Sequence, residues 1–430
     1  MSTTAFSLVF LLMIVLMLLG LPIAVSMVLV GAGAGVLLFG APFLSSTGAM
    51  LWGVLNDNLL TAAPLFILLG ELLLRSGMAD RMYGAMAAWL SRLPGGLLHT
   101  NIACCALFAA TSGSSVATAA TVGTVALPSL QARKYPMPQA LGSLAAGGTL
   151  GILIPPSINM IVYGSLTENS IGKLFIAGVI PGLLLTGLFM AYVWINSVAR
   201  GDVPREALPP MRERLALSVH LLPPLAIFGI VMGSLYTGFA TATESAALGV
   251  VVALFFTWTA GRLSWQMLET CFLQTARTTG MIMLILAAAF VLNLLISLSG
   301  VAETMTKSVT SLGLSATAML LVLMAFYMVL GMFMDVMSML VATVPITYPI
   351  VKALGVDPIW FGIFIILMCE LALITPPVGM NLFVVQGIRP DKGGIGDVIR
   401  GSLPYVGIML LFTFLLMAFP AIVTWLPGQM

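Results

Sequence analysis

Two short stretches interrupt long apolar runs of this chain, one a cluster of serines and the other ending in a single acid, and their side-chain oxygens are suited to holding a cation. The first cluster is the Ser-Gly-Ser-Ser stretch at 112–115, and the second runs from Gly331 to Asp335. A carboxylate at membrane depth costs about 2.5–3.5 kcal/mol on insertion scales, so an acid kept there is functional by default. We therefore expect Asp335 to act with a bound cation. The alternative is that its position is near enough to water to solvate the charge.

A pair of adjacent prolines follows each cluster in an apolar stretch. Pro155-Pro156 and Pro376-Pro377 cannot lie inside an intact helix, because proline lacks the backbone N–H and crowds the carbonyl one turn earlier. They leave the carbonyl oxygens of Gly151, Ile152 and Ala372 without helical donors. In a membrane such oxygens are tolerated only in buried protein or beside a wet cavity. The pattern predicts two broken helices; the alternative is that the prolines only kink packed helices.

Cluster oxygens and freed carbonyls together predict two cation sites, and the family resemblance given below implies that the cation is sodium. For Glu370 two interpretations stay open, lining the substrate cavity or bonding to the scaffold, and Glu244 is expected to pair within the scaffold. The first sodium site is expected at Ser112, Gly113, Ser114, Ser115, Gly151 and Pro155, and the second at Gly331, Asp335, Ala372, Thr375 and Val378. Candidate substrate contacts lie beside the same breaks, where helix N-termini attract anions: Ser114, Thr149, Pro156, Asn159, Glu370, Pro377 and Asn381.

The composition is typical of a membrane protein. Of 430 residues, 60% are hydrophobic and 7% are charged, against roughly 25% charged in soluble domains. The net charge of +2 gives no indication of nucleic-acid binding. The N-terminus lacks the basic region of a signal peptide, so the apolar run 6–19 is predicted to stay as the first membrane helix.

The reactive residue types argue against several other classes of protein. The four cysteines lie in apolar segments and form no Cys-x-x-Cys pair, which argues against zinc and against a disulfide framework. The two histidines are far apart in the sequence, and no nucleophile motif accompanies them. We therefore expect neither a transition-metal site nor an enzyme.

Helical hairpins are the elements that would position these clusters. The apolar run 97–130 is cut in its middle by the first polar cluster, which predicts a re-entrant hairpin with a buried tip. Residues 78–93 mix arginines with apolar residues, as in a helix lying along the membrane surface. The polar loop 200–214 contains four arginines, is predicted to be cytoplasmic and divides the chain in half.

The second half of the chain repeats the first. Pro155 and Pro376 are 221 positions apart (376 − 155), as are Ser114 and Asp335 (335 − 114). Surface helix, hairpin, broken helix and following helix therefore occur twice. Basic residues flank the first set, whereas the second set is balanced. The positive-inside rule then predicts inverted repeats whose hairpins enter the membrane from opposite faces.

Several stretches resemble one known family. They are SGSSVATA at 112–119, GGTLGILIPPSI at 147–158, GMFMD at 331–335 and TPPVGMN at 375–381. A further stretch at 242–247 matches except that Ala242 replaces a proline, which leaves the start of that helix open. These motifs look like the large membrane subunit of tripartite ATP-independent periplasmic (TRAP) transporters, and the resemblance covers essentially the whole chain.

The resemblance implies a sodium-coupled importer of an organic acid, such as a C4-dicarboxylate or a sialic acid, in a bacterial inner membrane. Its partners would be membrane lipid, a periplasmic substrate-binding protein and a small four-helix membrane subunit. No extra four-helix block is present, so the small subunit is expected as a separate chain. Sodium would be the coupling ion, without an organic cofactor.

The expected fold is an all-α polytopic membrane protein with two inverted-topology repeats, each with a re-entrant helical hairpin and a broken helix. The resemblance adds a static scaffold and an elevator-type transport domain. The expected divisions are scaffold helices 1–75 with a surface arm 76–96, a transport-domain half 97–172, a connecting helix and cytoplasmic loop 173–214, scaffold helices 215–298, a second arm 299–317, the second transport-domain half 318–394 and a C-terminal helix 395–430.

Two functional hypotheses stay open at this point. The leading one is the sodium-coupled subunit supplied by a binding protein. The alternative is a stand-alone sodium- or proton-coupled carboxylate carrier of the same architecture that needs no binding protein. A membrane-embedded enzyme or a passive channel ranks well below both.

Overall fold

The computed structural model describes residues 9, 11–13, 15–17, 19–56, 60–201, 209–300, 303–304, 306–307, 313–391 and 393–429. In this part of the chain the secondary structure is helical, and six helices are each long and apolar enough to cross a membrane. This confirms a multi-span all-helical protein. Parts of the predicted first helix 6–19, of the loop 200–214 and of the arm 299–317 lie outside the described residues.

A helical hairpin and an interrupted helix form the first half of the site. The hairpin helices α6 and α7 pack against each other and meet at Gly113 and Ser114, where the Ser114 hydroxyl accepts the Ala117 N–H and caps α7. The next helix ends at Ile152 and resumes only after Pro155-Pro156, which confirms the predicted interruption. The bounds are α6 Leu97–Ser112, α7 Ser115–Ala132, α8 Met137–Thr149, η1 Leu150–Ile152 and α9 Ile158–Thr167.

The second half contains the corresponding elements. The hairpin helices α16 and α17 are joined by residues 332–335, and the Asp335 carboxylate caps α17 by accepting the Ser338 N–H at 3.1 Å. The following helix ends at Ile374, just before Thr375 and Pro376-Pro377. The bounds are α16 Ala316–Gly331, α17 Val336–Ala353, α18 Pro358–Ile374 and α19 Met380–Gly387.

The remaining helices surround these two units. α4 ends in a Glu71–Arg75 ion pair, at 3.3 Å, and the chain then bends by 70° into α5 at the positive-φ Gly77. The long α14 packs against α2, α3 and α4 and also reaches α17. The bounds are α2 Ile23–Phe39, α3 Pro42–Leu55, α4 Ala62–Arg75, α5 Met78–Leu90, α10 Ile171–Arg200, α11 Met211–Ser218, η2 Val219–Leu221, α12 Leu222–Tyr236, α13 Ala242–Thr259, α14 Trp265–Ser299, α20 Ile395–Ala418, α21 Ala421–Thr424 and η3 Pro427–Gln429.

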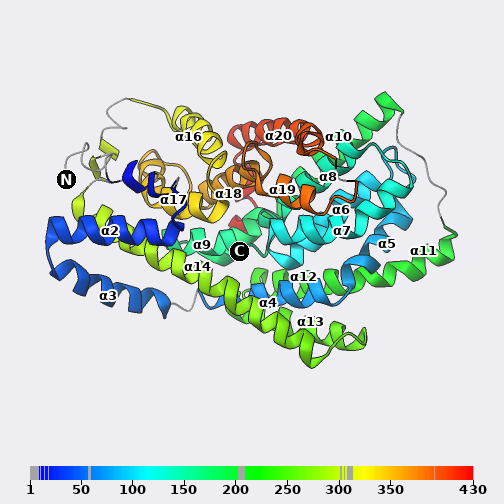
Figure 1. The fold of residues 1–430 in the computed structure, drawn as a ribbon, viewed down its shortest axis with the longest axis horizontal. Helices are drawn as coiled ribbons and strands as arrows, with labels where there is room; N and C mark the ends of the chain where they lie inside the picture. The colour runs from blue at the N-terminus through cyan, green and yellow to red at the C-terminus, as the bar shows by residue number, and fades with distance from the viewer. Residues whose placement is uncertain are drawn as a thin grey trace.

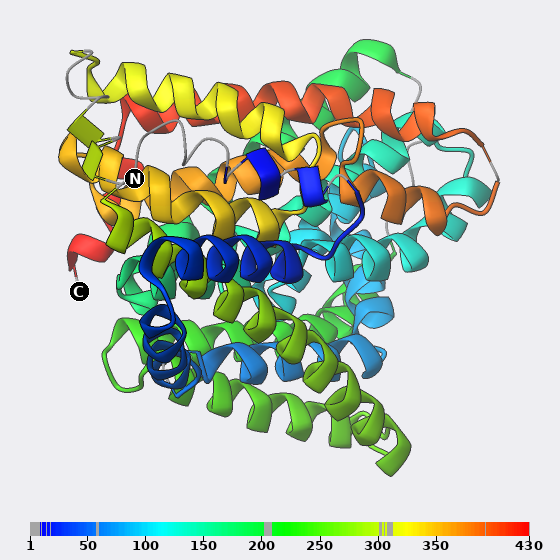
Figure 2. The same cartoon turned by 60° about the vertical axis from the view of Figure 1, so that its left-hand side comes forward.

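The two hairpins lie at opposite ends of the molecule. In Figure 1, α6 and α7 occupy the right-hand half with α5 and α11, whereas α16 and α17 occupy the left-hand half. Figure 2 shows a second division, with α13 and α14 on the lower side and α16 and α20 on the upper side. The space between the hairpins is therefore bordered by helices from both halves of the chain.

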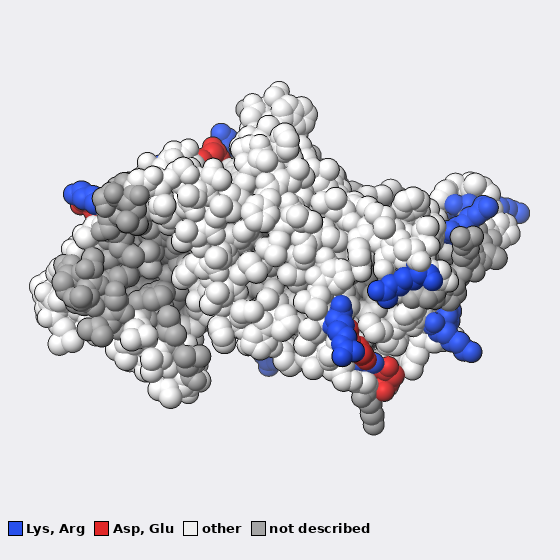
Figure 3. All heavy atoms as spheres, turned by 90° about the horizontal axis from the view of Figure 1, so that it is seen from above, with Lys and Arg blue, Asp and Glu red and all other residues white. Residues whose placement is uncertain are grey.

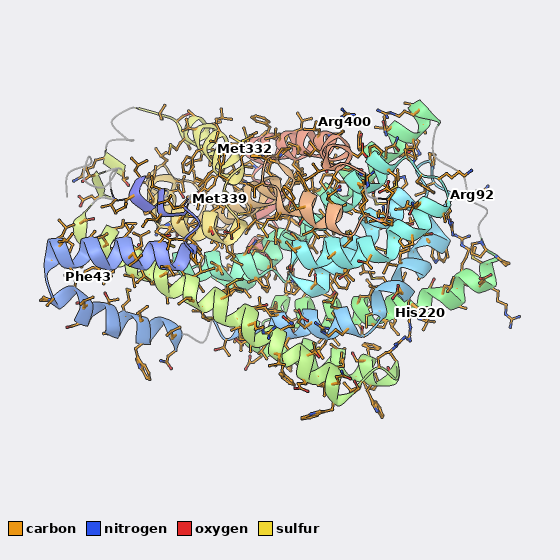
Figure 4. All side chains as sticks on the ribbon, in the orientation of Figure 1. Phe43, Arg92, His220, Met332, Met339 and Arg400 are labelled. Atoms are coloured by element: carbon orange, nitrogen blue, oxygen red, sulfur yellow. The ribbon has the colours of Figure 1, made fainter. Side chains whose placement is uncertain are left out.

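Charge is also unevenly distributed along the molecule. In Figure 3 most of the Lys and Arg side chains visible on that face gather toward the right-hand end. Figure 4 places Arg92, Arg400 and His220 in the same half. By the positive-inside rule, this end, which carries the base of the first hairpin, is expected to face the cytoplasm.

Candidate functional site

A cavity of about 220 Å³ lies where the two hairpin tips and the two breaks meet. Asp335 is the only charged side chain among the described residues that line it. A cavity of this kind, apolar with a few placed polar groups, is typical of a small-molecule site. The lining residues are Gly113, Ser114, Ser115, Val116, Ile152, Ile158, Asn159, Thr278, Met281, Ile282, Asp335, Val336, Met337, Leu373 and Met380.

Four helices begin at this cavity. The first residues of α7, α9, α17 and α19 all belong to its lining, and Ser114, Ser157 and Asp335 cap three of them. The first backbone N–H groups of a helix have no intrahelical acceptor, and the helix dipole places partial positive charge there. The cavity therefore has the local field of an anion site, although no basic side chain lines it among the described residues.

The first predicted sodium set is brought together. A methyl group on Gly151 would lie 2.8 Å from the Ser114 carbonyl oxygen, and one on Gly113 would lie 2.9 Å from the Pro156 carbonyl oxygen. The Ser115 hydroxyl donates to the Thr149 carbonyl oxygen at 3.1 Å. Glycine is needed at both close approaches, because any side chain would push the hairpin tip away from the break.

Hydroxyl groups at the first tip are arranged in a short chain. The Thr118 hydroxyl donates to the Ser114 carbonyl oxygen at 2.7 Å, so its contact with Ser112, at 2.9 Å, is a donation from the Ser112 hydroxyl. The oxygen of Ser112 keeps its lone pairs. Pro155 has no N–H to donate to the Gly151 carbonyl oxygen, so that oxygen also lacks its helical partner. The tip and the break together offer hydroxyl and carbonyl oxygens but no formal charge.

The second predicted set is only partly gathered. A methyl group on Gly331 would lie 2.5 Å from the Ala372 side chain, which places the end of α16 directly against the end of α18. The Thr375 hydroxyl is buried and donates to the Leu371 carbonyl oxygen at 2.6 Å. Val378 is 39% exposed and does not line the cavity. The structure therefore does not bring it together with the other residues predicted for this site.

Asp335 lies on the surface of the second tip. Its carboxylate accepts from both the N–H and the hydroxyl of Ser338. It lines the central cavity and also a second cavity of about 390 Å³ bordered by Met17, Leu21 and Ile23. The carboxylate is therefore positioned to face a cation, and the alternative of a tip reached by water stays open.

Three predicted substrate contacts are turned away from the cavity. The Thr149 hydroxyl donates to the Ala146 carbonyl oxygen within α8, and the Asn381 amide donates to the Ala145 carbonyl oxygen at 3.2 Å. Both side chains serve helix packing, because the last turn of α8 faces α7 and α19. Glu370 is fully buried, does not line the cavity, and has its carboxyl group beside the backbone of Leu153 at the first break. Its role stays a prediction.

The remaining candidates divide between the cavity and its surroundings. Ser114 and Asn159 line it, whereas Pro156 lies buried beneath the first tip and Pro377 is exposed outside it. Glu244 forms a capping box with Thr241 at the start of α13, so its role there is structural. That box also settles the helix start that Ala242 had left open.

One wall of the cavity was missed from the sequence. Thr278, Met281 and Ile282 of α14 close the side opposite the breaks. The only available signal was a polar interruption, residues 277–279, in the middle of a long apolar helix. Nothing in that pattern says which hairpin the helix faces.

Comparison with known proteins agrees with this arrangement. The family model of the tripartite ATP-independent periplasmic transporter, DctM component, matches residues 10–422. The chain is 38% identical to the C4-dicarboxylate TRAP transporter large permease protein DctM of Pseudomonas aeruginosa, covering 91% of this chain and 92% of that protein. It is 31% identical to the 2,3-diketo-L-gulonate TRAP transporter large permease protein YiaN of Escherichia coli, covering 92% and 93%.

Two further matches concern chain organisation and fold. The isethionate TRAP transporter permease protein DctMQ of Oleidesulfovibrio alaskensis is 31% identical over 95% of this chain but only 64% of its own length. The crystal structure of the Alcanivorax borkumensis YdaH transporter superposes with a TM-score of 0.66 at 16% identity, over 91% of this chain and 89% of that one. The latter likeness concerns the fold alone. The family match spans nearly the whole chain, and this protein therefore belongs to the DctM family, the large inner-membrane permease component of TRAP transporters, and is not an enzyme.

Proposed function

We propose that this permease imports an organic acid together with sodium, taking the acid from a periplasmic binding protein. The observation that carries the proposal is the meeting of four helix N-termini and two hairpin tips at one cavity. Membrane transporters place such half-helix ends at their substrate and ion sites.

The two ends of the broken elements have complementary roles in this proposal. The N-termini of α7, α9, α17 and α19 attract the carboxylate of the substrate. The C-terminal carbonyl oxygens of α6, η1, α16 and α18, with the hydroxyls of the first tip and the carboxylate of Asp335, hold sodium behind it. Sodium bound next to Asp335 also reduces the repulsion between that residue and an anionic substrate.

An elevator motion fits the way the cavity is built. Its lining comes from two hairpins and two broken helices on one side and from α14 on the other. In the proposed cycle, residues 97–172 and 318–394 move together against the helices around α14. The inverted repeat of the two halves would make the inward-facing and outward-facing states similar in energy.

The partners follow from the same relatives. The fused name DctMQ of one relative, together with its extra length, supports a small membrane subunit as a partner. The relatives named for C4-dicarboxylates, 2,3-diketo-L-gulonate and isethionate all handle organic anions. The substrate proposed for this chain is therefore an organic anion, with a C4-dicarboxylate as the first candidate and a sialic acid as a further one.

Reconstitution tests the proposal directly. The full chain is co-purified with its small subunit, placed in proteoliposomes and supplied with radiolabelled succinate, with and without the binding protein and an inward sodium gradient. We expect uptake only when both are present. Uptake that ignores the binding protein would favour the stand-alone carrier, and equilibration without a gradient would favour a channel. If succinate is not taken up, the acid that stabilises the binding protein against heat replaces it.

A further inference from the structure

Another cavity, of about 250 Å³, lies far from the central one. It is formed by the C-terminal end of α10, the first turns of α20 and the start of α8. Arg200 and Arg400 enter it from two different helices, and Asn196 lies one turn before Arg200 on the same face of α10. Figure 4 shows Arg400 at the edge of the molecule. The lining residues are Leu98, Pro138, Gln139, Tyr192, Val193, Asn196, Arg200, Arg400, Gly401, Pro404 and Tyr405.

The described residues that line this cavity carry positive charge only. No acidic residue is among its described lining residues. The nearest acid along α20, Asp397, is engaged by Arg389 at 2.8 Å. Two guanidinium groups facing one space without a carboxylate form a site for an anion, and arginine binds phosphate oxygens in a bidentate manner.

The surroundings of the cavity are apolar. Trp194, Ile195 and Val198 on α10 and Leu403 on α20 are all at least half exposed on the outer surface beside it. Inside, Tyr192 and Tyr405 pack edge to face at 5.1 Å and form a rigid wall. The ligand that fits is therefore amphipathic, with an anionic group between the arginines and hydrocarbon along the exposed apolar side chains.

The cavity lies in the half of the molecule that carries the basic residues of Figure 3. The positive-inside rule assigns that end to the cytoplasm, so Arg200 and Arg400 are at the level of the inner leaflet's head groups. Basic pockets between membrane helices at this level bind the head groups of acidic lipids.

We propose that this cavity binds the phosphate of an acidic phospholipid of the inner leaflet, with Arg200 and Arg400 as its ligands. The lipid joins α10 to the α8–α20 pair, which is itself in very close contact through Gly142 and Gly401. It thereby fixes α10, in the first half of the chain, to α20, in the second half. This site is independent of the transport cavity and of the identity of the transported acid.

Thermal unfolding in defined lipids tests this site. The full chain, purified with its small subunit and delipidated, is titrated with phosphatidylglycerol, cardiolipin or phosphatidylcholine. We expect the two acidic lipids to raise the unfolding temperature and phosphatidylcholine to leave it unchanged. In Arg200→Gln/Arg400→Gln the apparent lipid affinity should fall about fivefold for each arginine removed.

Matched controls keep the proposal falsifiable. The Arg92→Gln/Lys134→Gln variant removes two exposed positive charges that do not line the cavity, and it should respond to acidic lipid like the parent protein. If the double variant at 200 and 400 does not fold, the single Arg400→Gln variant is titrated instead. An unchanged lipid response in the cavity variants, equal stabilisation by phosphatidylcholine, or stabilisation through the same arginines by free succinate but not by phosphatidylglycerol would each overturn the proposal.

Discussion

The two proline breaks share a sequence pattern but differ in their surroundings. In the first break every residue from 149 to 158 is buried, and the hairpin tip lies directly against it. In the second break Pro377 and Val378 are exposed, and the tip carries Asp335 where the first tip carries Ser114. The same motif is therefore packed tightly and without charge in one half, and is open and acidic in the other.

This difference shows how a repeated sequence can give two halves with different tasks. The first tip is fixed by a Ser115–Thr149 hydrogen bond and by two glycines, Gly113 and Gly151, at its contacts. In the second half the close approach is made from the hairpin side, by Gly331 against Ala372. We infer that, inside the unit proposed to move as a whole, the first tip stays fixed against its break and the second tip opens as a movable gate.

The largest expected effect comes from removing the charge that distinguishes the second tip. Asp335→Ser gives that tip the residue found at the equivalent position of the first, and serine still caps a helix. Sodium-driven uptake in proteoliposomes should be lost while expression and the unfolding temperature stay near those of the parent. Asp335→Ala should lose uptake and, with the cap gone, also about 1 kcal/mol of stability.

The serine variant separates charge from capping. Normal sodium dependence in Asp335→Ser would show that the carboxylate is only a helix cap. In that case the hydroxyl and carbonyl oxygens of the tip would have to be sufficient for coupling.

The rate at which an introduced cysteine is labelled should differ between the two breaks by about tenfold or more, since a buried thiol reacts only after local opening. Val378→Cys and Ser157→Cys occupy equivalent positions, one 39% exposed and the other fully buried. We expect a water-soluble maleimide to label position 378 rapidly and position 157 slowly. All four native cysteines are buried and provide the low background. Equal labelling rates would contradict the proposed division into a fixed and a movable half.

The interruptions, the hairpins and their caps were predictable because they depend on local chemistry. The adjacent prolines interrupt a helix in each half, whereas single prolines such as Pro181 and Pro404 lie inside helices. Ser114 and Asp335 cap the helices that follow them at matching positions of the repeat. The residues of the first predicted sodium set do lie close together, since each is within a few positions of a tip or a break, and their binding of sodium stays a prediction. Such features need no knowledge of how distant helices pack.

What could not be predicted is the direction in which a side chain next to a break points. Thr149 and Asn381, like Asn159, lie within six residues of a proline pair, yet only Asn159 reaches the cavity. The choice depends on how α8, α9 and α19 are rotated by their neighbours. The wall contributed by Thr278 on α14 depends on the same long-range packing.

A smaller effect is expected from crowding the first break. In Gly151→Ala the added methyl group would meet the backbone of Ser114 and Ser115 at 2.8–2.9 Å, and overpacking of this kind costs about 1–3 kcal/mol. We expect a lower unfolding temperature and slower uptake. Gly187→Ala is the control, because nothing lies within contact distance of Gly187 on α10. If Gly151→Ala changes neither the unfolding temperature nor the uptake rate, the tip and the break are free to separate.

The smallest expected effect tests the hydrogen bond that joins the first tip to its break. Ser115→Ala removes the donor to the Thr149 carbonyl oxygen, and a net hydrogen bond of this kind contributes about 0.5–1.5 kcal/mol. If this bond holds the first half in place, maleimide labelling of Ser157→Cys should become several-fold faster in the Ser115→Ala background, while labelling of Val378→Cys should not change. Thr375→Val removes a hydroxyl at the second break, whose bond to the Leu371 carbonyl oxygen stays within one helix end. It should therefore leave both labelling rates unchanged, and an equal acceleration by the two substitutions would remove the distinction between the halves.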